Sequence, residues 1–225
     1  MLSAIIVAAG QGLRLKAGVP KPLVKIGKLP AIIYSLNTLD KHLDIDEIIV
    51  VLNAKNQRAI TRLIRSYSFK KIKGFVLGGR RRQDSVYNGL GMVSPDSDWI
   101  LIHDSARPFI DSQAVTRVIL AAKKTGSAIL GVPVKATIKS IKSGDLVDRT
   151  LDRSNLWEIQ TPQVFKKELI LRAYQEYSKG SVTDDASLVE KLGKKVKIVL
   201  GSYENIKITT EEDLLFAEAI GKRKR

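Results

Sequence analysis

The sequence contains no cysteine, only two histidines and no long hydrophobic run. Without cysteine, disulfide bonds and thiolate chemistry are excluded, and a zinc site would depend on His42, His103 and carboxylates, which show no ligand spacing. No stretch approaches the ~20 apolar residues that cross a bilayer. The apolar run at residues 3–9 has no basic segment before it and ends at a glycine, which indicates a strand rather than a signal peptide. We therefore expect a soluble, cytoplasmic protein without a membrane partner.

Acidic residues are also scarce. The chain has 38 lysines and arginines against 23 aspartates and glutamates, a formal net charge of +15. Such a balance fits either a nucleic-acid-binding protein or an enzyme for anionic small molecules. The basic residues are spread along the chain, and no basic strand is interleaved with aromatic residues that could stack on bases. Composition therefore favours the enzyme, and we do not expect nucleic acid as a partner. A nucleic-acid-binding protein stays the non-enzyme alternative.

Short β-branched runs alternate with segments of helical periodicity over the first 134 residues. The runs that predict buried strands are residues 3–9, 47–52, 99–103 and 128–134. The segments that predict helices are residues 31–42, 56–67, 85–93 and 112–124. This alternation is typical of βαβ units, so we expect an α/β fold with a mostly parallel central sheet and helices on both of its faces.

On either side of Ser143-Gly144-Asp145 the pattern changes to strict alternation of apolar and polar residues. This predicts a protruding β-hairpin, or arm, at about residues 134–156. Helices are expected next at residues 166–177 and 185–192, and strands at residues 196–201 and 205–209. A last helix should begin at Glu211, with Thr210 as its N-cap. Because no repeat or linker interrupts the chain, we expect residues 1–225 to form a single domain with an inserted arm.

The loop after the first predicted strand reads AAGQGLRLK and leads to PKP. Gly10 and Gly12 let the backbone approach a ligand closely, and exposed N–H groups in such a loop bind anions. Leu15 stands where a dinucleotide-binding motif needs a third glycine, and no GK[ST] follows, so the loop is not a P-loop. Arg14, and Lys21 between two prolines, add cations that suit a polyphosphate.

The order of the motifs resembles one family of nucleotidyltransferases. The chain contains, in sequence, AAG-x-G-x-R, PKP, GGRRRQDSVYNGL, HDSARPF, DRSNLWEIQTPQVF, TDDAS and NIKIT, from Ala4 to about Ala219. This order resembles that of the 2-C-methyl-D-erythritol 4-phosphate cytidylyltransferase family of the non-mevalonate isoprenoid pathway. The resemblance implies a Rossmann-like nucleotidyltransferase fold. It also implies an enzyme that joins methylerythritol phosphate to CTP with release of pyrophosphate, using Mg²⁺ or another divalent cation and no nucleophilic side chain.

The resemblance also implies roles for individual residues. The catalytic residues implied are Arg14, Lys21, Arg153 and Lys207. The nucleotide-binding residues implied are Ala8, Ala9, Gly10, Gly12, Gly79, Arg82, Ser85 and Asp104. The substrate-binding residues implied are Asp104, Ser105, Arg107, Thr137, Arg153, Thr161, Thr183 and Lys207. Asp104, directly after a predicted strand, is the expected magnesium ligand.

Other residues have a structural interpretation or depart from the family pattern. His103 is expected to be structural, and Thr183 also fits the N-cap of the helix that follows it. Arg80 stands where the family often has an acidic residue, Ser105 where alanine is usual, and Ala136 where aspartate is usual. These departures bear on single contacts with the substrates rather than on the fold.

Two further expectations concern the arm and the substrate. In the family the arm carries the arginine matched by Arg153 into the neighbouring subunit's site, which implies a homodimer. Ribitol-5-phosphate cytidylyltransferases share the glycine loop, HD-x-x-RP and TPQ, so ribitol phosphate is the alternative substrate. The stretch DRSNLW before QTPQ favours methylerythritol phosphate.

Overall fold

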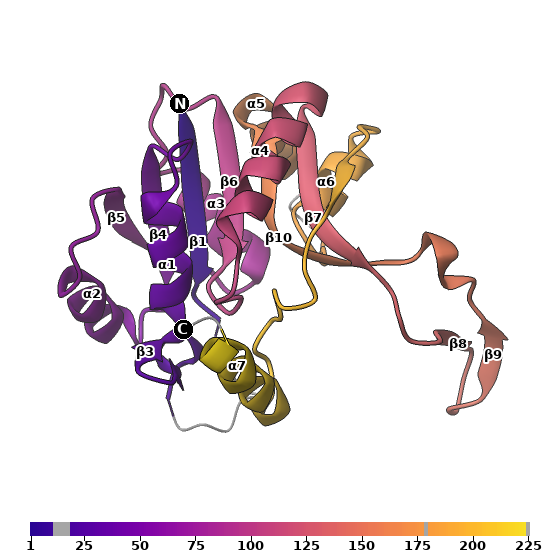
Figure 1. Cartoon of the computed structure of the whole chain (residues 1–225). Coiled ribbons are helices and arrows are strands. Elements are labelled where there is room, and N and C mark those ends of the chain that lie inside the picture. The colour runs from indigo at the N-terminus through magenta and orange to yellow at the C-terminus, as the bar shows by residue number, and fades with distance from the viewer. Residues whose placement is uncertain (11–18, 178–179, 224–225) are drawn as a thin grey trace.

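The computed structural model describes residues 1–10, 19–177 and 180–223 of the chain. A seven-stranded sheet with the strand order β11-β7-β10-β6-β1-β4-β5 runs through it (Figure 1). The strands are β1 (Leu2–Ala8), β4 (Glu47–Leu52), β5 (Ile72–Leu77), β6 (Trp99–Asp104), β7 (Ser127–Pro133), β10 (Trp157–Lys166) and β11 (Lys197–Leu200). Strand β10 pairs antiparallel with β6 and β7, and the other neighbouring strands pair in parallel, which confirms the mostly parallel sheet.

Helices cover both faces of this sheet, as expected from the continuous apolar character of its strands. One face packs against α1 (Ala31–Lys41), α2 (Gln57–Arg65) and α4 (Ser112–Thr125), and the other against α3 (Arg82–Leu90), α5 (Lys167–Tyr177) and α6 (Ala186–Lys191). Side chains alternate between the two: Ala4 and Ile6 of β1 belong to the first cluster, and Ile5 to the second. Both sides of β1 are therefore buried, and its carboxyl end is held rigidly.

Three local predictions need correction. Strand β5 was not among the predicted strands, because it lies at the sheet edge, only partly buried, where apolar and polar residues mix. Helix α3 begins at Arg82 rather than residue 85, because the Asp84 carboxylate accepts the backbone N–H of Arg81 at 3.0 Å and stabilises an earlier start. Residues 205–209 form a loop instead of a strand, since their hydrogen bonds go to separate elements rather than to one partner strand.

A short hairpin and a 3₁₀ turn follow the glycine loop. The turn is η1 (Lys21–Leu23), and the hairpin pairs β2 (Lys25–Ile26) with β3 (Leu29–Pro30). The last helix, α7 (Glu211–Arg223), packs Ala217 against a small cluster that includes Ile26 and Phe109. Thr210 Oγ1 accepts the backbone N–H of Asp213 at 3.4 Å, which confirms Thr210 as the N-cap. These contacts pack α7 against the β2–β3 hairpin.

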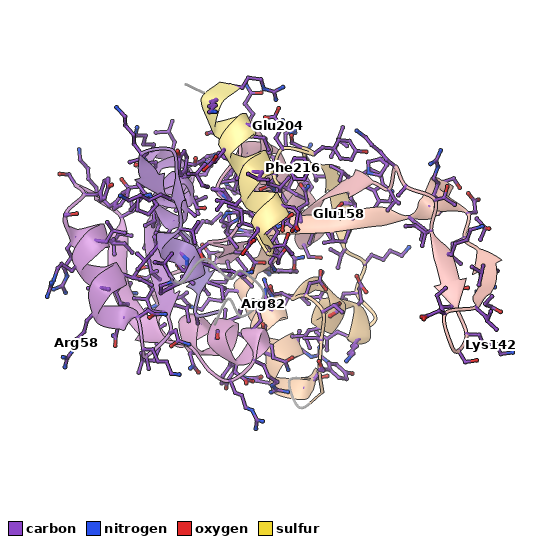
Figure 2. The ribbon with its side chains drawn as sticks, turned by 90° about the horizontal axis from the view of Figure 1, so that it is seen from below. Arg58, Arg82, Lys142, Glu158, Glu204 and Phe216 are labelled. Carbon is purple, nitrogen blue, oxygen red and sulfur yellow. The ribbon has the colours of Figure 1, made fainter. Side chains whose placement is uncertain are left out.

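The predicted arm is present between β7 and β10. Strands β8 (Lys139–Ile141) and β9 (Val147–Thr150) pair antiparallel, and Gly144 and Asp145 take φ of 58° and 60° in the turn between them. The arm then returns through the 3₁₀ turn η2 (Arg153–Asn155). Figure 1 shows this hairpin extending away from the sheet, and Figure 2 shows Lys142 at its tip. In the described ranges no helix is long and apolar enough to cross a membrane.

Candidate active site

A cavity of about 660 Å³ lies beyond the carboxyl ends of β1, β4, β5 and β6. This first cavity is where an open α/β sheet places its ligands. Its lining includes the predicted residues Ala8, Ala9, Gly10, Lys21, Gly79, Arg82, Ser85, Asp104, Ser105 and Lys207. Segments up to two hundred residues apart in the chain therefore meet in one place. Gly12 and Arg14 lie outside the described residues.

The loop between β5 and α3 forms one wall of the first cavity. Ser85 Oγ accepts the Gly79 N–H at 3.1 Å and donates to the Arg81 carbonyl at 3.1 Å, so this hydroxyl shapes the loop. A Cβ at Gly79 would lie 2.3 Å from Cβ of Asp84, closer than real Cβ atoms approach. Gly79 is thus required for tight packing of the loop on α3, which leaves its backbone accessible to a ligand.

The floor of the first cavity is a buried carboxylate between two cations. Arg82 Nε donates to Asp104 Oδ1 at 2.9 Å, and Lys207 Nζ donates to Oδ2 at 2.5 Å. Burial alone would raise the pKa of Asp104, but the positive charges of Arg82 and Lys207 outweigh it and hold that pKa well below its usual range. The carboxylate is therefore ionised, with each of its oxygens held by a cationic side chain.

Arg82 is itself held from two sides. Its second guanidinium contact is Asp185 Oδ2 at 2.9 Å, and Tyr174 donates its hydroxyl to Asp185 Oδ1 at 2.6 Å. Burial and the neighbouring Asp185 raise the pKa of Tyr174, so the phenol stays protonated and keeps donating. Figure 2 places Arg82 in the central part of the molecule. Arg82 therefore acts as a rigid cation that fixes Asp104.

A buried chain of hydrogen bonds fixes the backbone around Asp104. Thr161 Oγ1 accepts the Asp104 N–H at 3.0 Å and lies 3.0 Å from Nδ1 of His103, while Nε2 of His103 donates to the Arg107 carbonyl at 3.1 Å. Because Nε2 carries the proton, Nδ1 accepts the threonine hydroxyl. Complete burial lowers the pKa of His103 to about 4, so the ring is neutral near pH 7. His103 is structural, as expected, and Thr161 has the same positioning function.

Lys21 reaches the segment that carries Lys207. Its Nζ donates to the carbonyls of Ile208 and Thr209, both at 3.2 Å. Pro20 and Pro22 restrict the backbone on either side, and η1 holds the turn. Lys21 therefore lies beside the segment of Lys207, and both lysines line the first cavity.

A second cavity of about 430 Å³ adjoins the first. The residues that line both cavities are Arg82, Asp104 and Lys207. The second cavity also has Arg107, Thr161 and Thr183 in its wall, which the sequence assigned to the substrate. The three shared side chains thus form the boundary across which groups in the two cavities would meet.

Arg107 is largely engaged with the backbone. Its guanidinium donates to the carbonyls of Asn205 at 2.6 Å and Ile159 at 3.2 Å, and its Nε is buried without a hydrogen-bond partner in the described part of the chain. Burial lowers the pKa of Arg107, although it stays protonated near neutral pH. Arg107 thus anchors the segment before Lys207 and contributes positive charge to the second cavity.

The donor set of the first cavity suits magnesium better than a transition metal. In residues 1–10, 19–177 and 180–223, no group of three histidine, cysteine, aspartate or glutamate side chains could hold a metal ion. Asp104 offers one ionised carboxylate at the cavity floor. Mg²⁺ commonly takes one or two carboxylates and completes its shell with phosphates and water, whereas a structural zinc site needs four protein ligands. The residues present therefore fit Mg²⁺ bound together with a phosphate ligand.

Comparisons with known proteins identify the family of the chain. A family model described as 2-C-methyl-D-erythritol 4-phosphate cytidylyltransferase matches residues 2–223. This chain belongs to that family. An enzyme of that name from Shouchella clausii is 45% identical over 99% of this chain and 97% of its own length. Another, from Geobacillus thermodenitrificans, is 45% identical over 96% of this chain and 95% of its own.

A solved structure supports the same assignment. The 4-diphosphocytidyl-2C-methyl-D-erythritol synthase of Anaerococcus prevotii has a TM-score of 0.88 and 37% identity, over 99% of this chain and 96% of its own. The expected Rossmann-like nucleotidyltransferase fold and the expected activity are confirmed. The chain is a CTP-using cytidylyltransferase of isoprenoid biosynthesis with methylerythritol phosphate as its substrate.

Some predicted site residues of this cytidylyltransferase do not lie in its two cavities. Thr137 and Arg153 are exposed on the arm, and within the described ranges they line neither cavity of their own chain. Thr183 lines the second cavity, but it is not the N-cap of α6: Asp185 occupies that position, and Asp184 Oδ1 accepts the Ser187 N–H at 3.1 Å. The aspartate side chain is the one that reaches the open backbone N–H.

Sequence reasoning also missed two residues of the site. Asn53 lines the first cavity and donates to the Ala9 carbonyl at 3.2 Å. A polar residue directly after a buried strand was the available signal. Asp185, which neutralises Arg82, stands in TDDAS, but only the fold shows which cation it faces.

Proposed function

We propose that the first cavity binds CTP and that the second binds the phosphate of methylerythritol phosphate. The observation that carries this is the shared boundary: Arg82, Asp104 and Lys207 line both cavities. For the two phosphate groups to react, they must meet at a site of positive charge. The boundary supplies two cations for this, Arg82 and Lys207. The lining of glycines and alanines in the first cavity suits a nucleotide that contacts backbone groups.

The transfer requires positioning and charge neutralisation rather than a nucleophilic side chain. A phosphate oxygen of methylerythritol phosphate attacks the α-phosphorus of CTP and forms a new P–O bond. The bond from the α-phosphorus to the bridging oxygen of the β-phosphate breaks, and pyrophosphate leaves with that electron pair. The attacking oxygen is already anionic, so a strong base is unnecessary. In this proposal Lys21, Lys207 and Arg14 stabilise the charge on the α-phosphoryl group.

Asp104 is the proposed ligand for Mg²⁺ or another divalent cation. When bound, such an ion would neutralise part of the triphosphate charge. Arg82 and Lys207 keep the Asp104 carboxylate ionised and fixed for this task. Thr161 and His103 hold the Asp104 backbone. Removal of divalent ions with a chelator should abolish turnover, and added Mg²⁺ should restore it.

We further propose that residues 1–225 form one nucleotidyltransferase domain and that the chain is a homodimer through the arm at about residues 134–156. Arg153 then enters the second cavity of the partner subunit, with Thr137 beside it. Arg107 already lines that cavity, but its guanidinium donates hydrogen bonds to the backbone carbonyls of Asn205 and Ile159. A substrate phosphate therefore needs another cation. The arm also exposes Leu146 and Val147, which a partner would cover. Cytoplasmic location stays a prediction from the sequence.

The direct test is pyrophosphate release from CTP and Mg²⁺ with methylerythritol phosphate or ribitol 5-phosphate as acceptor. We expect turnover with methylerythritol phosphate, and little with ATP, UTP or GTP in place of CTP. Turnover with ribitol phosphate alone would keep the chemistry and change the acceptor. No turnover with any pair, from folded protein, would contradict the assignment and favour the nucleic-acid alternative.

A further inference from the structure

The segment at residues 201–209 joins β11 to α7 and carries Lys207 to the boundary of the two cavities. It begins at Gly201, whose N–H donates to the Gly131 carbonyl at 2.8 Å. It ends where the Ile208 N–H donates to the Ala106 carbonyl at 2.9 Å, next to Asp104. Lys207 therefore depends on a loop that is tied to β7 at one end and to the site at the other.

Tyr203 connects this loop to the root of the arm. Its hydroxyl donates to the Pro133 carbonyl at 2.7 Å, at the last residue of β7. The Lys135 Nζ lies 3.5 Å from the centroid of the Tyr203 ring, a cation–π contact. The Tyr203 side chain is 44% exposed, so it is not a buried core residue whose contacts follow from packing against the sheet.

The connection continues from Lys135 to Arg153. The Arg153 guanidinium donates to the Lys135 carbonyl, and the Val134 N–H donates to the Leu156 carbonyl at 3.0 Å. These bonds tie the outgoing and returning strands of the arm together at its root. Arg153, Lys135, Tyr203 and the loop of Lys207 thus form a continuous series of contacts within one chain.

We propose that Tyr203 is a positioning residue that couples the arm to the loop of Lys207. This proposal rests on the arm exchange proposed above. In the exchanged dimer Arg153 serves the partner's site while Lys207 serves its own, so each Tyr203 joins a residue of one active site to a residue of the other. Tyr203 touches no reacting atom, and its effect is on where Lys207 and Arg153 lie.

Variants of Tyr203 separate its two contacts. Tyr203→Phe keeps the ring and loses the bond to Pro133, and Tyr203→Leu loses both contacts. We expect the KM for methylerythritol phosphate to rise about threefold in Tyr203→Phe and about tenfold in Tyr203→Leu, with the KM for CTP within about twofold of wild type. Tyr67→Leu, which removes a ring remote from both cavities, is the matched control. Unchanged kinetics in Tyr203→Leu, or an equal rise in the control, would overturn the proposal.

Differently tagged chains allow heterodimers with one working site to be purified. When wild type pairs with a Lys21→Ala, Tyr203→Leu double variant, the wild-type site receives the altered arm. We expect it to show the raised KM for methylerythritol phosphate. When Tyr203→Leu pairs with Lys21→Ala, the working site has a normal arm and an altered Lys207 loop. We expect a kcat lowered about threefold or more with a normal KM. Wild-type values in either heterodimer would overturn the coupling.

A third heterodimer tests the arm exchange separately from the role of Tyr203. Lys21→Ala paired with Arg153→Ala has one intact site only if the arm acts in the partner. An inactive pair of these chains would contradict the exchange, and the Tyr203→Leu homodimer would still test the contact at the arm root. Thermal unfolding midpoints within a few degrees of wild type would show that the variants are folded.

Discussion

Lys207 Nζ lies 2.5 Å from Asp104 Oδ2, although the two residues are 103 positions apart in the chain. The pair sits where the two cavities meet, with Arg82 on the other carboxylate oxygen. One carboxylate thus orders two cations on the reaction path that we propose. The same two cations keep the Asp104 carboxylate ionised, as its proposed role as a metal ligand requires. The first three predictions follow from this site.

Lys21→Ala should lower turnover about 100-fold or more, because it removes one preorganised charge from the phosphoryl group being transferred. Steady-state pyrophosphate release with CTP, Mg²⁺ and methylerythritol phosphate measures this. Lys25→Ala is the matched control, since Lys25 is exposed on the adjacent hairpin and lines neither cavity as described. Near-normal turnover of Lys21→Ala would contradict the role assigned to this lysine.

Asp104→Asn should lower both activity and stability. The change leaves Arg82 and Lys207 facing each other without their shared negative charge. We expect the free energy of unfolding to fall by about 3 kcal/mol, the low end for a broken buried ion pair, because Lys207 is partly exposed. Urea denaturation measures the loss, with the exposed Asp96→Asn as control. A stable variant with full turnover would exclude Asp104 from the site.

Arg153→Ala and Lys21→Ala homodimers should each be nearly inactive, and their mixed dimers should recover turnover. If the arm acts in the partner subunit, one site of each mixed dimer contains both intact residues. We expect about half of wild-type turnover per purified mixed dimer, because one of two equivalent sites works. No recovery from confirmed mixed dimers would show that the arm serves its own chain.

Stability should fall in acid through Glu47, at the end of the sheet remote from the cavities. Burial would raise the pKa of Glu47, but hydrogen bonds from Ser3 and Ser94, with Lys73 at 3.1 Å, outweigh it and lower that pKa to about 2. A carboxyl group whose pKa is lowered by folding stabilises the folded state at pH values above its pKa in the unfolded chain, which is near 4.5. The contribution, about 3 kcal/mol, is lost progressively as pH falls from about 4.5 to about 2.

The free energy of unfolding, measured with denaturant between pH 6 and pH 3, tests this. Glu47→Gln should be less stable at pH 6 and should lose the part of the pH dependence that Glu47 contributes. Glu168→Gln, at a side chain that is 74% exposed, should follow wild type. Identical pH slopes in wild type and Glu47→Gln would refute the assignment.

Local sequence patterns were sufficient for most elements of the fold. Strand β4 and the start of α7 occur where periodicity and capping predicted them, because each depends on neighbouring residues. Strand β5 was missed because an edge strand has only a weak apolar pattern. The strand expected at residues 205–209 is a loop because its hydrogen-bond partners come from several elements.

The sequence by itself determined the residue types of the site: a glycine loop, the cations Lys21 and Lys207, and Asp104 at the end of a buried strand. Only the tertiary structure decided their partners. Arg82 lies between Asp104 and Asp185, and the Thr161 hydroxyl supports the backbone of Asp104. Local periodicity indicates which residues are buried, but these contacts join residues 22 to 103 positions apart. They follow from the strand order and from strand β10, which runs antiparallel to its neighbours. These contacts convert a set of charged residues into one ordered site.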